Sequence, residues 1–346
     1  MTEIRLITIL EFVLGAVLGF LSIWGLTRWA HKMHLLDLPD ERKHHKVPVP
    51  RLGGLCIFPL LSLTVPIGMG FTGDWQRSFL SLWGAAFILY LLGIREDLYR
   101  VSPKGKFRFQ ILATLIFLTG GVYLMYPDHI FGISTLGWFG YIATAAIVLH
   151  IVNAVNLIDG IDGLSAELCI CSLLVSGTVE YLEGNAAFAI LAVATVGILV
   201  AFLSFNLPEK VFMGDTGCWT LGLVIVFLGL HSGQCGHPRT GLLVTLAPRL
   251  IPLLDMARVA LFRVTHGISV VHPDNNHIHH LLMRKGLSQR QTRLLLVGIT
   301  LFHTALNYWL CQWVPTGWIL VAEVALIVCG AILLNSRIPP PEKKLQ

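Results

Sequence analysis

Residues 186–205 read AAFAILAVATVGILVAFLSF and contain no charged side chain. A helix of about 20 mostly apolar residues is long enough to cross the hydrocarbon core of a bilayer. The run is typical of the chain, whose 346 residues are 55% hydrophobic and only 13% charged. Soluble domains carry roughly 25% charged residues. This chain therefore has too little polar surface to cover a water-soluble globule, and a bilayer is its expected solvent.

Similar apolar runs recur along the whole chain. Backbone groups within lipid must find partners inside their own segment, so long apolar runs indicate helices. We expect an all-α, polytopic transmembrane helical bundle that forms a single integral membrane catalytic domain over residues 1–346, with a short cytoplasmic tail at 336–346. About eleven spans are expected, at residues 4–30, 53–71, 78–94, 107–126, 136–155, 166–182, 186–205, 217–233, 241–262, 293–312 and 316–335.

Basic residues alternate between the two sets of loops. One set is rich in lysine and arginine, whereas the opposite set holds only Arg77 and Arg239. The positive-inside rule makes the basic set cytoplasmic. An odd number of spans then places the N-terminus outside and the C-terminus in the cytoplasm. The net charge of +5 is modest and indicates no nucleic-acid partner.

Acidic side chains concentrate on the same side as the basic loops. The outer loops hold only Asp74, Asp128 and Glu183. Solvation of loops would account for any single inner acid, but it accounts poorly for the whole set. Carboxylates together with substrate phosphates are the preferred ligands of Mg²⁺, so the set suggests a divalent cation site. The inner acids are Asp37, Asp40 and Glu41, then Glu96 and Asp97 at the start of the second inner loop, Asp159, Asp162, Asp215 and Asp274.

The most informative motif is NAVNLIDGIDGL at residues 153–164. Asp159 and Asp162 are three residues apart, so a helical turn would place both on one face. The glycine after each aspartate allows the backbone to approach a ligand closely. Asn153 and Asn156 add amide groups at the membrane edge. A simple helix-ending turn would not require two acids and two amides in so apolar a chain.

A second motif, FMGDTG at residues 212–217, follows Pro208, which should end the preceding helix. A Gly-Asp turn that leads into a helix offers free N–H groups and the carboxylate of Asp215, which together could hold a metal ion and a phosphate. Such turns are common, so this motif indicates a functional site only in combination with the other motifs.

A third motif contains His277, His279 and His280. Three histidines in four residues could bind Zn²⁺ or form a surface cluster. No cysteine lies nearby and Asp274 precedes them, so we favour imidazoles that hydrogen-bond a phosphate or a sugar.

The first inner loop, RKHHKVPVPRLGG at residues 42–54, is basic and stiffened by prolines. We interpret it as a clamp for phosphate groups, with a pure topology signal as the alternative. Within the ninth apolar run, Asp255 and Arg258 are spaced for an internal ion pair.

Together these motifs resemble the polyprenyl-phosphate N-acetylhexosamine-1-phosphate transferase family, which is related to the phospho-MurNAc-pentapeptide translocases. The resemblance runs from Asp37 to about Gly286, and the His-Ile-His-His form is similar to the bacterial N-acetylglucosamine-1-phosphate branch. Glu96 replaces the first acid of a usual Asp-Asp pair, which keeps the charge but lengthens the arm. Asn275 stands where a basic residue is common, and Cys218 replaces a usual serine, which we interpret as a packing change.

The resemblance implies transfer of N-acetylglucosamine-1-phosphate, or a related N-acetylhexosamine-1-phosphate, from a UDP-sugar to undecaprenyl phosphate. UMP is released and a lipid-linked cell-envelope glycan is started. The implied cofactor is Mg²⁺, with Mn²⁺ as a substitute. The implied location is the bacterial plasma (inner) membrane, with the active site on the cytoplasmic face, and a homodimer is compatible with this interpretation. Direct attack by the lipid phosphate and a two-step route through an aspartyl-phosphate both remain open.

Site roles follow from the resemblance. The expected catalytic residues are Glu96, Asp97, Asp159, Asp162 and His280, and the expected metal ligands are Asp215, Asp97 and Glu96. The expected substrate-binding residues are Asp37, Lys43, His45, Arg51, Lys106, Asn153, Asn156, Asp274, His277 and His279.

Three alternative functions compete with this interpretation. One is a phospho-MurNAc-pentapeptide translocase-like enzyme, and another is a multi-pass membrane transporter. Transporters place polar residues near the bilayer midplane in broken helices, whereas the acids here lie at helix ends. An intramembrane metalloprotease would need a His-Glu-x-x-His helix, which the sequence lacks.

Overall fold

The structure of the protein is a computed structural model that describes residues 2–37, 48–124, 136–235, 247–267, 269 and 276–335. Apart from one isolated bridge between Asp37 and Val49, all regular structure in these ranges is helical, as the sequence predicted. The helices are α1 (Thr2–Lys32), α2 (Ile57–Thr72), α3 (Ser78–Tyr99), α4 (Pro103–Leu118), α5 (Phe139–Ile158), α6 (Leu164–Leu182), α7 (Ala186–Asn206), α8 (Gly214–Cys235), α10 (Leu250–Thr265), α11 (Ile278–Arg284), α12 (Gln289–Leu310) and α13 (Thr316–Asn335), with 3₁₀ turns η1 (Gly53–Cys56) and η3 (Ala247–Arg249).

Eight segments of the described chain are long and apolar enough to cross a membrane, which makes this a multi-pass membrane protein. They comprise α1, η1 with α2, α3, α5, α6, α7, α8 and α13. The other expected spans coincide with α4, α10 and α12. Since α4 and α10 contain only 16 residues each, the total of eleven crossings stays a prediction.

Two boundaries differ from expectation, and both concern the site. The span expected at residues 78–94 continues as α3 to Tyr99, where Arg100 leaves the helix with a φ of 55°. Glu96 and Asp97 therefore lie on the last turns of a helix rather than in a loop. The helix expected from residue 107 begins at Pro103, because Ser102 caps it by accepting a hydrogen bond from the backbone N–H of Gly105 at 3.2 Å.

The centre of the bundle is built by α7 and α8, whose apolar windows are 83% and 89% buried, whereas α1 and α13 are only 22% and 11% buried. Because lipid tails are as apolar as leucine, close backbone contact at small residues holds such helices together. At Gly197 of α7, a Cβ would lie 2.3 Å from the carbonyl oxygen of Phe12. Helix α1 therefore packs directly on the backbone of the central helix.

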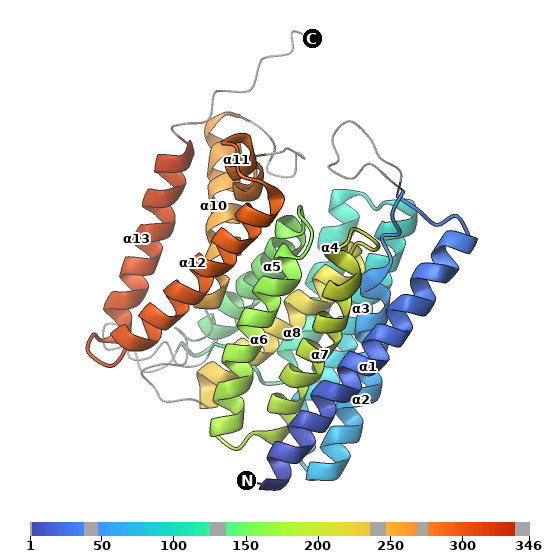
Figure 1. The fold of residues 1–346 in the computed structure, drawn as a ribbon. Coiled ribbons are helices and arrows are strands. Elements are labelled where there is room, and N and C mark those ends of the chain that lie inside the picture. The colour runs from blue at the N-terminus through green and yellow to red at the C-terminus, as the bar shows by residue number, and fades with distance from the viewer. Residues whose placement is uncertain are drawn as a thin grey trace.

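The two ends of the described chain lie at opposite ends of the bundle (Figure 1). The beginning of α1 lies at the bottom of the view, and the end of α13 lies at the top, near α11. An odd number of crossings produces such an arrangement, and the orientation of the two termini stays a prediction.

Candidate active site

The end of α3 is fastened to the beginning of α8 by the side chain of Asp97. Its Oδ1 accepts a hydrogen bond from the backbone N–H of Asp215 at 2.9 Å. Its Oδ2 accepts from the backbone N–H and the hydroxyl of Thr216, at 3.1 and 2.7 Å. The first N–H groups of a helix lack partners within the helix, and the helix dipole favours a negative charge there. Gly93 permits this approach, because a Cβ on it would lie 2.3 Å from the Cα of Thr216.

The first inner loop and the FMGDTG motif form one hydrogen-bonded unit. The backbone N–H of Phe212 donates to the carbonyl of Pro50, and its own carbonyl accepts from the N–H of Gly53, both at 2.9 Å. Gly214 then turns the chain into α8 with a φ of +75°, a conformation that favours glycine. A Cβ at this position would lie 2.6 Å from the carbonyl oxygen of Arg51. Two motifs far apart in sequence thus form adjacent backbone segments.

Asp215 lies between two cations and is only 8% exposed. Its Oδ2 is 3.6 Å from Nζ of Lys106, and its Oδ1 is 3.9 Å from Nη2 of Arg51. Lys106 also pairs with Oε1 of Glu96 at 2.8 Å, and Oε2 of Glu96 accepts a hydrogen bond from the backbone N–H of Val101 at 2.6 Å. Lys106 therefore bridges an acid of α3 and an acid of α8.

Four side chains of this cluster line a cavity of about 280 Å³ whose wall carries both signs of charge, namely Arg51, Glu96, Asp97 and Asp215. Arg51 stands near several carboxylates around it. Burial alone would lower the pKa of Arg51, but the nearby carboxylates raise it above its ordinary value. These carboxylates belong to Asp215, Asp97, Asp37 and Asp159. Asp97 and Asp215 therefore lie in one cluster with Arg51, and Asp159 is near enough for its charge to act on the same guanidinium.

Asp159, the residue that follows α5, belongs to the NAVNLIDGIDGL motif and adds a further carboxyl group near this cluster. Burial raises the pKa of Asp159 to about 7, while a hydrogen bond from the thiol of Cys218 and the charge of Arg51 act in the opposite direction. Burial therefore favours the protonated form of this carboxyl group more than it would be favoured in water. A strongly shifted pKa beside specific charged partners is typical of a functional group. Cys218, expected to be a packing change, in fact contacts a predicted catalytic acid.

Asp162 has different partners from Asp159. The predicted helical turn is wrong here, because α5 ends at Ile158 and a non-helical turn with a positive φ at Gly163 follows. Oδ1 of Asp162 accepts a hydrogen bond from the amide of Asn206 at 3.2 Å, and Oδ1 of Asn206 accepts from the N–H of Gly163 at 2.6 Å. Burial raises the pKa of Asp162 to about 6. Asp162 thus connects the turn to the end of α7.

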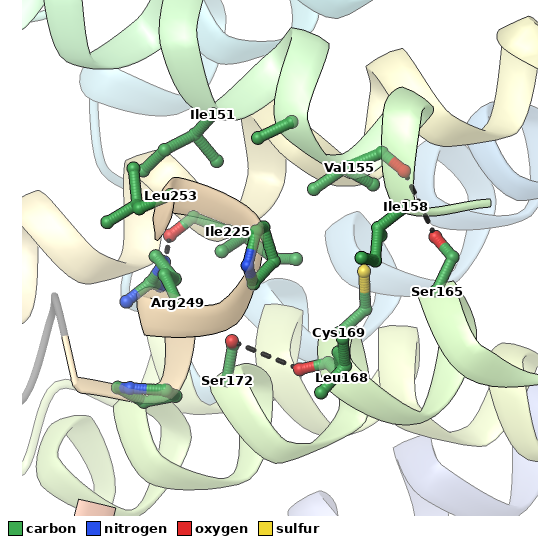
Figure 2. Close-up of a pocket in the computed structure, with 13 residues that line it drawn as sticks. Ile151, Val155, Ile158, Ser165, Leu168, Cys169, Ser172, Ile225, Arg249 and Leu253 are labelled. Atoms are coloured by element: carbon green, nitrogen blue, oxygen red, sulfur yellow. Dashed lines mark hydrogen bonds between the residues drawn. The ribbon is translucent and has the colours of Figure 1, made fainter. Parts of the chain in front are cut away.

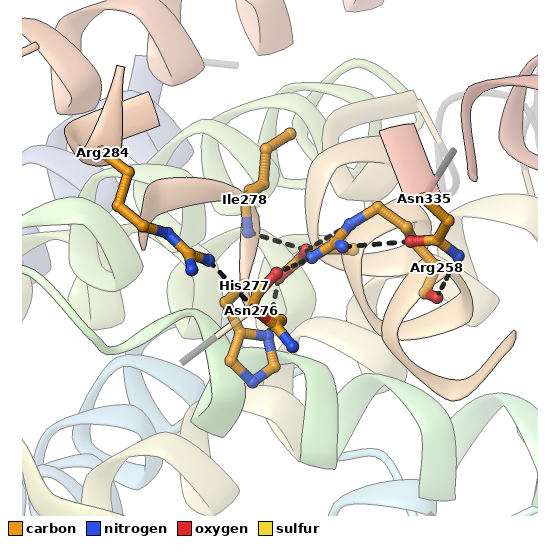
Figure 3. A network of polar contacts seen from close by, with 7 residues as sticks. Arg258, Asn276, His277, Ile278, Arg284 and Asn335 are labelled. Atoms are coloured by element: carbon orange, nitrogen blue, oxygen red, sulfur yellow. Dashed lines mark hydrogen bonds and ion pairs between the residues drawn. The ribbon is translucent and has the colours of Figure 1, made fainter. Parts of the chain in front are cut away.

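The ion pair predicted between Asp255 and Arg258 is confirmed, and it holds the histidine motif in place. Nη2 of Arg258 lies 2.8 Å from Oδ1 of Asp255, and Nδ1 of His277 lies 2.8 Å from Oδ2 of the same carboxylate. Arg258 also donates to the backbone carbonyl of Asn276 and, at 3.3 Å, to the side chain of Asn335 (Figure 3). The contact at Nδ1 leaves Nε2 as the nitrogen of His277 that a ligand can use.

His279 places the histidine motif directly against the turn that contains Asp159. A Cβ on Gly160 would lie 2.1 Å from Nε2 of His279, so the imidazole packs on the Gly160 backbone. The ring of His279 is stacked with that of His277 at 5.9 Å and tilted against that of His280 at 4.2 Å between centroids. All three parts of the predicted site therefore meet at one end of the bundle.

The remaining predicted residues have different places in the structure. Asn153 exchanges two side-chain hydrogen bonds with Gln110 of α4, at 3.0 and 3.1 Å, so its amide braces two helices. Asn156 is partly buried one turn later on α5. Asp37 lines the cavity and pairs through its backbone with Val49. Lys43, His45 and Asp274 lie outside the described residues.

Several residues around the site were not predicted from the sequence. Thr216 binds Asp97, and Asn206 organises the turn at Asp162. Trp219 lies beneath Lys106, with its ring centroid 5.7 Å from Nζ. Thr216 is next to Asp215, and Trp219 lies one helical turn further along α8. This closeness in sequence to a predicted site residue is the signal from which both could have been predicted.

The carboxylates of this site differ in how well they could hold Mg²⁺. In the described part of the chain, no three His, Cys, Asp or Glu side chains surround a common metal position. Mg²⁺ often uses only one or two carboxylates together with waters and substrate phosphates. Asp97 already uses three of its roughly four lone-pair positions, and Glu96 pairs with Lys106. Asp215 fits a magnesium ligand best, while direct ligation by Asp97 and Glu96 stays a prediction.

A family model and the most similar known proteins indicate the same family for this chain. Residues 79–233 match the family model described as Glycosyl transferase family 4. The undecaprenyl-phosphate alpha-N-acetylglucosaminyl 1-phosphate transferase of Escherichia coli (strain K12) is 32% identical over 276 residues, which cover 77% of this chain and 74% of that protein. The protein of the same name from Haemophilus influenzae is 34% identical, over 85% of this chain and 84% of its own length. A Bacillus subtilis protein named "Probable undecaprenyl-phosphate N-acetylglucosaminyl 1-phosphate transferase" is 30% identical, over 98% and 97%.

Proposed function

The chain belongs to glycosyl transferase family 4, with the undecaprenyl-phosphate N-acetylglucosaminyl 1-phosphate transferases, and from this premise we infer that it performs their reaction. It transfers N-acetylglucosamine 1-phosphate to undecaprenyl phosphate. The observation that carries this conclusion is the cluster in which Asp215, whose backbone is held by Asp97, lies between Arg51 and Lys106 at one end of a membrane bundle. A site of this kind, next to lipid and lined by both signs of charge, suits a reaction between two phosphate-bearing substrates.

The donor in this proposal is a UDP-sugar. An oxygen of the lipid phosphate attacks the β-phosphorus, a new phosphorus–oxygen bond forms, and the bond to UMP breaks. A phosphate monoester has its second pKa near 6, so the nucleophile is largely ionised at pH 7. The main barrier is therefore the approach of two anions beside low-dielectric lipid. Arg51 and Lys106, which flank Asp215 at 3.9 and 3.6 Å, supply positive charge for this approach.

Each acid has its own part in this proposal. Asp215 holds Mg²⁺, which supplies charge neutralisation for the diphosphate when bound. Asp97 keeps the first turn of α8, and with it Asp215, in a fixed position. Asp159, with a pKa of about 7, can hold or release a proton next to the reacting phosphates. His277 and His279 provide ring nitrogens for the sugar or a phosphate.

The proposed location is the plasma (inner) membrane of a bacterium, with the active site on the cytoplasmic face. The support is the positive-inside rule, because the loops that carry Arg51, Arg100 and Lys106 are those rich in basic residues and also line or border the cavity. The site would thus face the compartment in which nucleotide sugars are made. A homodimer stays a prediction.

The test uses purified protein with undecaprenyl phosphate and Mg²⁺ and measures release of UMP and formation of the lipid-linked product. UDP-GlcNAc, UDP-GalNAc and UDP-MurNAc-pentapeptide are compared as donors. The proposal expects UDP-GlcNAc to be preferred and UMP release to require the lipid acceptor. Failure to form a lipid-linked sugar phosphate from any of these donors contradicts the proposal. Uptake of a solute by proteoliposomes without UMP release would favour the transporter alternative.

A further inference from the structure

A groove on the exterior of the bundle lies between α1 and α6. Both helices pack on α7, which forms the floor of the groove, and Figure 1 shows α7 between them. The volume of the groove is about 300 Å³, which is the size of a small ligand site. Ile9 of α1 and Leu174 of α6 stand at its two sides and are 60% and 51% exposed. The groove is therefore open along its length and has an apolar wall.

This groove lies at the end of the bundle opposite to the candidate active site. The end of α7 contacts the site, because Asn206 donates a hydrogen bond to Asp162. The groove instead follows the first half of α7, from Ala189 to Val196. At a rise of about 1.5 Å per residue, it extends over about 10 Å and ends about 15 Å before Asn206. A molecule bound here is thus separate from the proposed substrates.

The face of α6 that lines the groove differs from its other face. Cys169 and Ser172 belong to the face that points towards α5 and α8, where they line a small pocket (Figure 2). Leu173, Gly177 and Tyr181 line the groove and are four residues apart, so they form one stripe along the helix. The small residue in the middle of this stripe leaves room between the larger side chains.

Arg5 and Tyr181 lie together at one end of the groove. Nε of Arg5, on the first turn of α1, donates a hydrogen bond to the hydroxyl of Tyr181, on the last turn of α6, at 2.9 Å. A guanidinium has five N–H donors, so four remain for another ligand. Glu180, the neighbour of Tyr181, is fully buried and pairs with His231 instead. Arg5 is the one charged side chain among the described residues that line the groove.

We propose that this groove binds one acyl chain of an anionic phospholipid, whose phosphate pairs with the guanidinium of Arg5. An apolar wall with a single cation at its end matches a molecule that has a hydrocarbon chain and an anionic head. The hydrogen bond to Tyr181 orients the guanidinium, which can bind a phosphate through two parallel N–H groups. A zwitterionic phospholipid carries its own cation, which competes with Arg5 for the phosphate.

A second copy of this chain fits the groove less well. A helix with its side chains is about 10 Å wide, so it could cover the groove but could not enter it. The bound lipid would also have a structural effect, because it joins α6 to α1, whose apolar window is only 22% buried. Since the lipid binds the folded state alone, it should raise the melting temperature.

The first experiment compares two lipids with the same acyl chains, dioleoyl-phosphatidylglycerol and dioleoyl-phosphatidylcholine. Delipidated protein in detergent receives equal amounts of both, and native mass spectrometry measures which lipid is retained first. The wild-type protein should prefer phosphatidylglycerol by about 5-fold, as expected for one arginine near a phosphate. Arg5→Gln should retain both lipids equally. Arg77→Gln is the matched control and should keep the preference, because Arg77 is exposed at the same end of the bundle but does not line the groove.

The second experiment blocks the groove and leaves Arg5 in place. Val193→Phe puts a large side chain into the groove, so it should abolish the preference for phosphatidylglycerol. It should also abolish the rise in melting temperature, about 2 °C or more, that this lipid gives the wild type relative to phosphatidylcholine. Val200→Phe is the matched control, because Val200 is 44% exposed on the same helix outside the groove. It should behave like the wild type.

Three results would each overturn the proposal. Equal retention of the two lipids by the wild type would mean that the groove accepts any hydrocarbon chain. A preference that survives in Arg5→Gln or in Val193→Phe would place the lipid elsewhere. A wild-type dimer that Val193→Phe dissociates would make a second copy the occupant. None of these readouts depends on transferase activity, so they are separate from the test of the proposed function.

Discussion

The carboxylate of Asp97 accepts a hydrogen bond from the backbone N–H of Asp215 at 2.9 Å, although the two residues are 118 positions apart in the chain. One acid of the site therefore fixes the backbone that presents another. The same carboxylate binds both the N–H and the hydroxyl of Thr216. This relationship separates the roles of two aspartates that look equivalent in the sequence.

Replacing Asp97 by Asn should impair both stability and activity. The amide nitrogen would face an N–H donor at the start of α8, and the favourable charge at this helix end would be lost. We expect a loss of about 1–3 kcal/mol in stability and of about 100-fold or more in kcat. Thr216→Ser, which keeps the hydroxyl, is the control and should retain most activity. An Asp97→Asn variant with unchanged melting temperature and rate would show that the contact is dispensable.

Asp215→Asn tests the metal role directly. The variant keeps the shape of the side chain but loses the charge that would hold Mg²⁺. We expect a fall in kcat of at least about 100-fold and a higher Mg²⁺ concentration for half-maximal activity. Titration of UMP release with MgCl₂, after removal of metal with EDTA, measures both quantities. If Asp215→Asn keeps the wild-type Mg²⁺ dependence, the ligand must be another acid.

Gly160→Ala should displace His279, because the new Cβ would lie 2.1 Å from the imidazole Nε2. Since this ring joins the histidine motif to the turn that contains Asp159, we expect kcat/KM for the donor to fall about 10-fold or more. Gly298→Ala on α12 is the matched control, because nothing lies within 4 Å of a Cβ at that position. Steady-state kinetics of both variants decide the matter, and equal rates would argue against a role for this contact.

The pKa of Asp159 predicts a pH-dependent stability difference. Burial raises this pKa from 3.8 to about 7, so the folded protein favours the protonated carboxyl. The stabilisation is fully present below about pH 4 and is lost as the pH rises through 7. Asp159→Asn lacks this titration, so its melting temperature relative to the wild type should increase between pH 5.5 and pH 8 by a few degrees, as expected for roughly 1 kcal/mol. Parallel melting curves in EDTA test this, and a constant difference across this pH range would contradict it.

The membrane fold follows from the sequence alone to a large extent. Long apolar runs such as residues 186–205 must be helical in lipid, because no other structure satisfies the backbone there. The motifs at the helix ends also predicted a group of acids on one side of the bundle, and the structure does place Asp97 and Asp215 beside each other and Asp215 beside Arg51. The roles of these residues stay predictions. The spacing of Asp255 and Arg258 also predicted their ion pair, because residues three positions apart lie on the same face of a helix.

The tertiary structure decided which groups the predicted residues bind. Asp97 accepts a hydrogen bond from the N-terminus of α8, Asn153 exchanges hydrogen bonds with Gln110, and Asp162 accepts one from Asn206. These partners come from other helices, and periodicity along one helix carries no information about its neighbours. Arg5 and Tyr181 are a similar case, because only the packing of α1 and α6 on α7 brings them together at the end of the groove. Sequence determines which segments enter the membrane, whereas the packing between helices determines what each polar group contacts there.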